Sequence, residues 1–270
     1  MIPVLWGLSP TGAEMNEVRT IRLRLSYDGS GHQGWQVQPG RRTIQGEVSA
    51  ALETVTGERV VVHGSGRTDA GVHALGQVAH IHLLASRLPV ANLARALNAR
   101  LPPQVRVLEA SEAHPEFHAR HHARSKLYRY RIFCEPVCPP FLWRYVYHHP
   151  YRLDDAAMAA AAPRFAGTHD FRSFAAAANA GAQERENTVR TVLRSELWRE
   201  GPEVIYEVQG TGFLHHMVRN LVGFLLEVGR GARSGEEIAA VLEARTRRAA
   251  ARTAPPQGLY LVRVDYGDTE

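Results

Sequence analysis

A short glycine-rich loop holds the residues best suited to chemistry. Residues 63–73 read His-Gly-Ser-Gly-Arg-Thr-Asp-Ala-Gly-Val-His, between two segments with strand-like patterning. Glycine tolerates positive φ and lets another molecule approach the backbone closely, so such a loop can hold one side chain at a fixed point above a sheet. Asp69 and Arg67 are the side chains it would hold. The plainer interpretation is a turn, in which Asp69 caps backbone N–H groups and Arg67 pairs with it.

The order of these residues is more informative than their types. Gly-Arg-Thr-Asp-Ala-Gly-Val-His-Ala from Gly66, followed by Gln-Val-Ala-His from Gln77, resembles the catalytic loop of the TruA family of tRNA pseudouridine synthases. Three further stretches resemble this family in the same order, between about Ile21 and Tyr266. They are Tyr27-Asp-Gly with Gly34-Trp-Gln, Phe117-His-Ala-Arg with Lys126-Leu-Tyr-Arg-Tyr, and Gly212-Phe-Leu-His-His-Met-Val-Arg-Asn with Gly258-Leu-Tyr-Leu-Val.

The resemblance implies an activity. Members of the family isomerise uridine to pseudouridine in the anticodon stem-loop of tRNA, at tRNA positions 38–40. The N1–C1′ bond breaks, the uracil rotates, and it is rejoined through C5, which implies no cofactor and no metal. The family's catalytic aspartate falls on Asp69. Whether its carboxylate adds to the base or the sugar, or assists elimination from C2′, stays open, but each route needs an ionised Asp69. Arg67 or Arg219 could lower the pKa of Asp69 by opposite charge.

The resemblance also implies roles for three residues that would bind the substrate. Arg219 is the ion-pair partner of Asp69, Arg67 helps to hold the target nucleotide out of its stack, and Tyr128 stacks on the uracil and is a candidate base for the C5 proton. Extruding a base from an RNA stem costs a few kcal/mol, which stacking and phosphate contacts must offset. On a strand, Tyr128 shares a face with Lys126 and would lie beside the loop. The plainer interpretation of Tyr128 is a core aromatic residue with a satisfied hydroxyl.

Basic residues gather on both sides of Tyr128. Their density, with histidines interleaved, predicts a track for RNA phosphates. The residues of this track are Arg120, Arg124, Lys126, Arg129, Arg131, His118, His121 and His122. Gly210-Thr211-Gly212 is expected to open a helix and to aim free N–H groups at a further phosphate.

The histidines do not predict a metal site, although the chain has 14 of them. Adjacent histidines such as His215-His216 are expected to point in different directions, and no H-E-x-x-H or cysteine-rich ligand set is present. Two rival functions stay open. A non-catalytic RNA-binding protein would gain nothing from an acid that repels phosphate, and a metal-dependent phosphohydrolase would be inhibited by a chelator.

The composition is that of a globular protein. Of 270 residues, 44% are hydrophobic and 22% charged, and no apolar run approaches the ~18 residues of a membrane-spanning helix. The net charge of +5 includes a single lysine, so arginine, which pairs bidentately with phosphate, supplies nearly all the basicity. An organism with a GC-rich genome or a high growth temperature would produce the same preference for arginine over lysine. Two cysteines, Cys134 and Cys138, are too few for a disulfide framework, and we expect a cytoplasmic location. The resemblance implies a homodimer that binds tRNA, without a membrane.

Strands and helices alternate irregularly along the chain, which predicts an α+β fold. Strands are expected at 21–27, 60–62, 77–83, 105–108, 127–133, 191–200, 204–209 and, as an edge strand, 258–265. Helices are expected at 43–57, 90–100, 153–165, 213–228 and 235–247, with a loop at 175–187.

The resemblance implies the pseudouridine synthase fold, in which two similar α+β sub-domains share a largely antiparallel mixed sheet with helices packed on it and a basic active-site cleft. We expect a flexible leader at residues 1–18. An N-terminal half at 19–125 would contain the loop 63–73, and a C-terminal half at 126–270 would complete one continuous catalytic unit. No role is assigned to the proline-rich segment 134–143.

Overall fold

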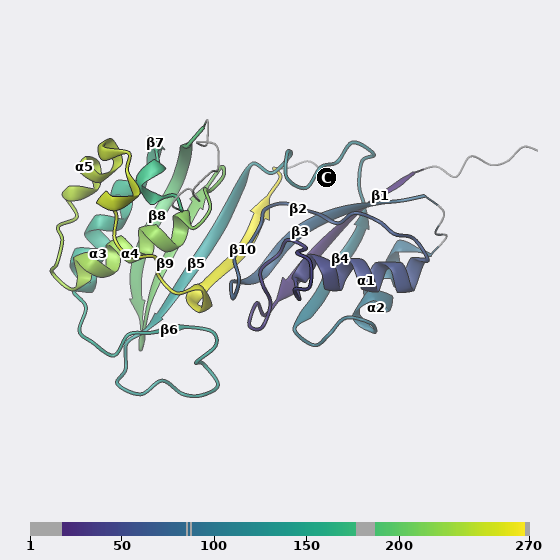
Figure 1. Cartoon of the computed structure of the whole chain (residues 1–270), viewed down its shortest axis with the longest axis horizontal. Coiled ribbons are helices and arrows are strands. Elements are labelled where there is room, and N and C mark those ends of the chain that lie inside the picture. Colours follow the sequence, from purple (N-terminus) through teal and green to yellow (C-terminus); the bar gives the residue numbers. More distant parts are fainter. Residues whose placement is uncertain (1–17, 85, 87, 177–186, 268–270) are drawn as a thin grey trace, which may run out of the picture.

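The computed structural model describes residues 18–84, 86, 88–176 and 187–267. All of the expected leader except its last residue, and most of the loop 175–187, therefore lie outside the described residues. One mixed sheet runs through this part of the chain, in the order β4-β1-β3-β10-β5-β9-β8-β7, with β2 paired to β3 and β6 to β5 (Figure 1). The strands are β1 (Arg19–Tyr27), β2 (His63–Gly64), β3 (His73–Leu83), β4 (Val105–Glu112), β5 (Ser125–Phe133), β6 (Tyr147–His148), β7 (Gly167–Asp170), β8 (Val189–Glu200), β9 (Glu203–Gly210) and β10 (Leu259–Asp265).

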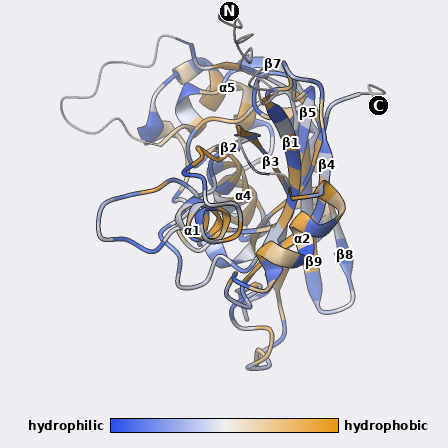
Figure 2. Cartoon of the chain, turned by 90° about the vertical axis from the view of Figure 1, so that its right-hand side faces the viewer, coloured by the Kyte–Doolittle hydropathy of each residue, from blue (hydrophilic) through white to orange (hydrophobic). Residues whose placement is uncertain are grey.

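Helices pack on this sheet in two groups. Helices α1 (Ile44–Thr56) and α2 (Val90–Asn98) lie beside β1, β3 and β4, whereas α3 (Asp155–Ala161), α4 (Met217–Gly229) and α5 (Glu237–Ala244) lie beside β8 and β9 (Figure 1). Seen from the side, α1 and α4 lie on the same side of the sheet (Figure 2). The predicted α+β class and largely antiparallel mixed sheet are confirmed, because only β3–β10 and β5–β6 pair in parallel among the described strands. No helix in the described ranges is long and apolar enough to cross a membrane.

The last strand does not lie where we predicted it. Strand β10 was expected at an edge, but it lies between β3 and β5, parallel to the first and antiparallel to the second. Its first residues, Leu259, Tyr260 and Leu261, are all buried. A continuous apolar run is typical of a strand covered on both faces, whereas an edge strand is usually shorter or interrupted by charge. The C-terminal strand thus joins the two groups of elements into one sheet.

The two faces of the sheet differ in chemistry. Alternate residues of β1, namely Ile21, Leu23 and Leu25, are fully buried, and the opposite face carries arginine–glutamate pairs. Arg129 Nη2 lies 2.7 Å from Glu207 Oε1 across strands β5 and β9, and Arg131 is similarly paired on the same face. The prediction that Arg129 and Arg131 belong to a phosphate track is therefore wrong, because strand alternation turns both away from Tyr128.

Helix α1 is confirmed together with both of its predicted ends. The Thr43 hydroxyl accepts a hydrogen bond from the Gly46 N–H at 3.3 Å, and Gly57 ends the helix with φ 75°. Thr43 is an ordinary N-cap residue and Gly57 an ordinary left-handed C-cap residue. The Thr43 hydroxyl and the Gly57 backbone N–H, which donates to the Glu53 carbonyl, both act within one turn of the helix, which is why the sequence alone located them.

Other expected elements differ from the structure. Residues 60–62 form no strand. The carbonyl of Val62 instead accepts a hydrogen bond from the Gln45 side chain at 2.9 Å. The expected helix 153–165 ends at Ala161 and continues as a 3₁₀ turn, and the expected helix 235–247 is the shorter α5. Helix α4 begins at Met217 rather than at residue 213, so Gly210-Thr211-Gly212 opens no helix and the phosphate contact predicted there is wrong.

Helix α4 is held close to the segment before β10, and this contact can be tested. A Cβ atom added at Gly223 would lie 1.9 Å from the Arg252 carbonyl oxygen, so Gly223→Ala must push the two segments apart. We expect this overpacking to lower the free energy of unfolding by about 1–3 kcal/mol, measured by urea denaturation. At Gly212 an added Cβ meets only the Arg190 side chain, at 3.8 Å. Gly212→Ala is therefore the control, and equal loss in both variants would contradict the explanation.

Candidate active site

The glycine-rich loop 63–73 is fastened by buried side chains below it. The Gln77 amide donates to the Gly66 carbonyl at 2.9 Å, and the Tyr27 hydroxyl is hydrogen-bonded to the Thr68 hydroxyl at 2.9 Å. All of these contacts are local to the sheet, since Gln77 lies on β3 and Tyr27 ends β1. These contacts fix the backbone just before Asp69, and the Val72 N–H donates to the Asp69 carbonyl at 3.1 Å on the other side, so Asp69 has little freedom.

Two further contacts explain residues of the other motifs. The Trp35 N–H donates to the Thr68 carbonyl at 3.0 Å, and the preceding Gly34 adopts φ 84° with no room for a side chain, because a Cβ would lie 2.6 Å from that same carbonyl. On the other flank, Lys126 Nζ donates to the Ser65 carbonyl at 2.7 Å. Burial, together with the charge of Arg120, lowers the pKa of Lys126 to about 8. Lys126 is therefore a support of the loop as well as part of the basic track.

Asp69 and Arg219 form the ion pair that the resemblance implied. Arg219 Nη1 donates to Asp69 Oδ2 at 3.0 Å, and both side chains are mostly buried. The guanidinium is itself oriented, because its Nε donates to the Ala254 carbonyl at 2.7 Å while the Ala254 N–H donates to the Arg219 carbonyl at 3.0 Å. Arg67, in contrast, is exposed and is not among the ion-pair partners of Asp69 in the described part of the chain.

Two histidines that the sequence did not predict to be functional also contact Asp69. His215 Nε2 lies 3.4 Å from Asp69 Oδ1, and His216 Nε2 lies 3.5 Å from Asp69 Oδ2. The expectation that adjacent histidines diverge is wrong here, since the two ring centroids are 3.9 Å apart. The cause is the left-handed backbone of His216, φ 62°, which turns the chain just before α4. The sequence feature that could have indicated their role is that both lie in the Gly212–Asn220 motif, together with Arg219.

Asp69 is poised as an anion by these neighbours. Burial alone would raise the pKa of Asp69, but the hydrogen bond from His215 and the charges of His216 and Arg219 outweigh it and hold the pKa below its usual value. The carboxylate is therefore ionised at neutral pH. Burial, with the charges of His215 and Arg219, also lowers the pKa of His216 despite the opposing effect of Asp69.

Tyr128 lies beside this group, as the alternation on β5 predicted. Its ring is almost fully buried and meets Phe213 edge to face, with centroids 5.1 Å apart. Burial, with smaller contributions from Tyr27 and Asp69, raises the pKa of Tyr128 well above its usual value. Its hydroxyl is therefore protonated at neutral pH and is a weak base in the free protein.

These residues line one cleft of about 1220 Å³, between the loop 63–73 and the start of α4. Its basic lining residues are Arg67, Arg120, Lys126, Arg190, Arg219, His63, His118, His121, His215 and His216. Asp69 is the one acidic residue among the described residues that line it. The cleft can thus attract a polyanion while holding one ionised carboxylate at its wall. Arg120, His118, His121 and Lys126 of the predicted phosphate track lie here.

At two places among the described residues, ring nitrogens or carboxylate oxygens of three side chains come within 4.8 Å of one another, as the ligands of a metal ion would. At Asp69, His215 and His216, one carboxylate oxygen already accepts from the cationic Arg219, which opposes a second cation. At His63, His80 and His118, backbone N–H groups donate to Nδ1 of His80 and of His118. A neutral ring that accepts at Nδ1 carries its proton on Nε2, so neither ring offers a free lone pair there. Neither donor set therefore fits a metal ion.

The electrostatic role of Arg219 can be measured directly. We expect Arg219→Gln to raise the pKa of Asp69, because loss of the cation removes a stabiliser of the charged form. Carbon-13 NMR of labelled aspartate carboxyl groups measures this pKa. Arg67→Gln removes the same charge from an exposed position without a contact to Asp69, so it should leave the pKa of Asp69 nearly unchanged. Similar shifts in both variants would show that only the overall charge matters.

The sequence of this chain is similar to those of known proteins over most of its length. The family model described as tRNA pseudouridine synthase matches residues 25–122 and 161–267. Among curated relatives, the tRNA pseudouridine synthase A of Solibacter usitatus is 49% identical over 92% of this chain and 100% of its own length. That of Moorella thermoacetica is 47% identical, over 91% and 99%, and that of Halalkalibacterium halodurans is 46% identical, over 90% of both chains. The chain therefore belongs to the tRNA pseudouridine synthase family of isomerases.

Proposed function

We propose that this chain isomerises uridine to pseudouridine in tRNA, with Asp69 as the reacting carboxylate and Arg219 as its ion-pair partner. The position of Asp69 carries the proposal: it is the one acid among the described residues lining a cleft of cations. Such an acid repels phosphate, so a protein that only bound RNA would gain affinity by losing it. The isomerisation, in contrast, needs a carboxylate against the nucleoside.

The reaction balances without any external reagent. The N1–C1′ bond of uridine breaks and C5 forms the new bond to C1′, so C5 must lose a proton while N1 gains one. The depressed pKa of Asp69 keeps its carboxylate available at neutral pH for attack on the nucleoside or for proton abstraction at C2′. No oxidant, reductant or phosphate donor is consumed.

Tyr128 and Arg67 are proposed to bind the extruded nucleotide. Tyr128 lies beside Asp69 with its ring supported by Phe213, an arrangement suited to stacking on a uracil. Arg67 is exposed and lines the same cleft, which supports its proposed role of contacting the RNA and keeping the base out of its stack. Tyr128 can take up the C5 proton only if the bound substrate offsets the effect of burial on its pKa.

The finer features of the substrate rest on the family resemblance. We propose that the target lies on the 3′ side of the anticodon stem-loop and that two copies of the chain act together as a homodimer on tRNA. A cytoplasmic location fits Cys134 and Cys138, which are free thiols in the structure.

The decisive experiment is tritium release from unmodified tRNA that carries 5-tritiated uridine, with EDTA present throughout. The unaltered protein should release tritium, and Asp69→Asn should slow release by at least about 10²–10⁴-fold, the usual contribution of a positioned acid or base. Glu243→Gln, an exposed residue of α5 with the same change in charge, is the matched control. RNA binding by each variant is measured in parallel.

Each rival function has its own result. No release from any tRNA by a protein that binds tRNA would favour a non-catalytic RNA-binding protein. Loss of release in EDTA, recovered by added metal, would favour metal-dependent chemistry instead.

Two substitutions separate stacking by Tyr128 from proton transfer. Tyr128→Phe keeps the aromatic face, whereas Tyr128→Leu removes it, so tRNA affinity should fall mainly in Tyr128→Leu, by about 1–3 kcal/mol for one stacked base. If the hydroxyl also takes the C5 proton, Tyr128→Phe should bind tRNA normally but release tritium slowly. Equal affinity in Tyr128→Leu and the unaltered protein would exclude stacking.

A further inference from the structure

A group of histidines lies along the cleft wall away from Asp69. His63 on β2 stacks on His80 of β3, with ring centroids 4.8 Å apart, and His118, from the segment after β4, lies 4.6 Å from His80. The ring of His121 lies 4.1 Å from that of His118. We call His63, His80, His118 and His121 the histidine cluster. His80 is buried beneath the other three, which line the cleft.

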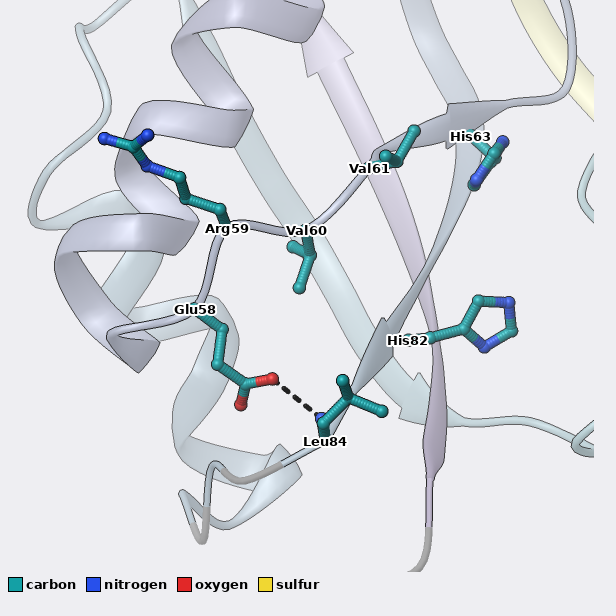
Figure 3. A pocket seen from close by; sticks show the side chains of 7 residues that line it. All are labelled: Glu58, Arg59, Val60, Val61, His63, His82 and Leu84. Atoms are coloured by element: carbon teal, nitrogen blue, oxygen red, sulfur yellow. Dashed lines mark hydrogen bonds between the residues drawn. The ribbon is translucent and has the colours of Figure 1, made fainter.

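The cluster is a group of bases with no acid. None of the ion pairs between described residues joins a carboxylate to any of its four rings, although His32, His73, His215 and His216 each face one. On its outer side, His63 also borders a smaller hollow of about 430 Å³. Figure 3 shows that hollow between the segment 58–63 and β3, with Glu58 accepting a hydrogen bond from the Leu84 N–H rather than facing a histidine.

The proton positions in the cluster are set by the backbone. The Ala119 N–H donates to His80 Nδ1 at 3.1 Å, and the N–H groups of Arg120 and His121 donate to His118 Nδ1 at 3.1 and 3.3 Å. Both neutral rings therefore carry the proton on Nε2, where each presents an oriented N–H donor. An Nε2–H group cannot coordinate a metal ion, but it can donate a hydrogen bond to an anion. A further proton would add positive charge, but at His118 it would enter at Nδ1 only if the Arg120 and His121 N–H groups moved away, a cost that attraction to a bound anion must offset.

The same wall holds permanent cations. Arg120 is exposed in the cleft, and Lys126 Nζ lies just below it against the loop 63–73. The anion expected in a cleft of this family is the phosphodiester of RNA, which has a negative charge and several acceptor oxygens. A phosphate beside the cluster would meet N–H donors from the histidines and the fixed charge of Arg120.

We propose that His63, His118 and His121, with Arg120, form a binding site for a backbone phosphate of the tRNA, and that phosphate binding there is coupled to uptake of a proton by His118. This site rests on the proposed function, because it assumes that the cleft receives tRNA. The buried His80 supports the His118 ring and does not itself contact the phosphate.

The direction of the pH effect follows from the groups around His118. Burial and the neighbouring rings His121, His63 and His122 lower the pKa of His118 in the free protein. Beneath it, burial with His118, His63 and His82 lowers the pKa of His80 to about 4. Lys126 and Arg120 also oppose charge on this wall. A bound phosphate supplies the missing anion and raises the pKa of His118. Affinity is then highest below the pKa of the free state, falls as pH rises between the two pKa values, and is lowest above the pKa of the bound state.

The test is the affinity for an unmodified tRNA transcript between pH 6 and pH 8.5 at fixed ionic strength. For one coupled proton, Kd should rise by up to about tenfold per pH unit within the window between the two pKa values. His118→Asn keeps an acceptor near the position of Nδ1 for the backbone N–H groups but cannot take up a proton. It should flatten this dependence and weaken binding at low pH. His148→Gln, on β6 away from the cleft, is the control and should behave as the unaltered protein.

Four results would overturn the proposal. The first is a Kd for the unaltered protein that does not change with pH, and the second is an unchanged pH dependence in His118→Asn. The third comes from nitrogen-15 NMR of the histidine rings: if tRNA leaves the pKa of His118 unchanged, no proton is taken up there. Stoichiometric binding of Zn²⁺ that is lost in His118→Asn would likewise favour a metal site instead.

Binding can be separated from catalysis. Asp69→Asn is assayed in the same titration, and its affinity should show the same pH dependence as that of the unaltered protein. If no tRNA is isomerised but this dependence is present, the proposed function fails while the phosphate site stands. If tritium is released and Kd is flat with pH, only the phosphate site fails.

Discussion

The ion pair between Asp69 and Arg219 is the contact on which the arrangement of the molecule depends. Its partners are 150 positions apart in the chain, one on the loop before β3 and the other on α4. Arg219 Nη1 can lie 3.0 Å from Asp69 Oδ2 only if the two groups of strands and helices keep a fixed position relative to each other. Removing one partner from a buried pair leaves an uncompensated charge, at a cost of about 3–5 kcal/mol. The sheet must therefore be continuous between them, and the insertion of β10 between β3 and β5 makes it so.

The helix that carries Arg219 is placed by backbone contacts. Gly223 lets α4 approach the segment before β10 so closely that no Cβ fits, and the exchange of hydrogen bonds between Arg219 and Ala254 fixes the guanidinium there. At the N-terminal end of α4, His216 adopts φ 62°. This conformation costs a non-glycine residue about 1–3 kcal/mol and persists only where the surrounding structure holds it. The strain turns both histidines toward the carboxylate, which an early start of α4 would prevent.

The sequence pattern predicted those features that depend on interactions between residues close together in the chain. The caps of α1 lie within a turn of the residues they satisfy, and the period-two alternation of β5 put Tyr128 and Lys126 on one face. The same alternation, applied to Arg129 and Arg131, would have excluded them from the cleft. Features that depend on contacts between residues far apart in the chain could not be predicted from local pattern. The central place of β10 depends on pairing across the chain, and the turn at His216 on strain that other contacts balance. The roles of Asp69 and Arg219 came from motif resemblance, because spacing alone does not reveal that residues 150 apart meet.

The cleft must satisfy two opposing electrostatic demands. A polyanionic substrate requires positive charge, yet the isomerisation requires a carboxylate that a nearby phosphate would push toward protonation. Placing Arg219, His215 and His216 against Asp69 meets the second demand, because these groups lower the pKa of Asp69 more than burial raises it. The remaining cations, Arg67 and Arg120 among them, face the open cleft and are left for phosphate. One wall therefore keeps the acid ionised while the others attract RNA, and the separation of these tasks explains why the basic residues are divided between the loop 63–73, the segment after β4 and α4.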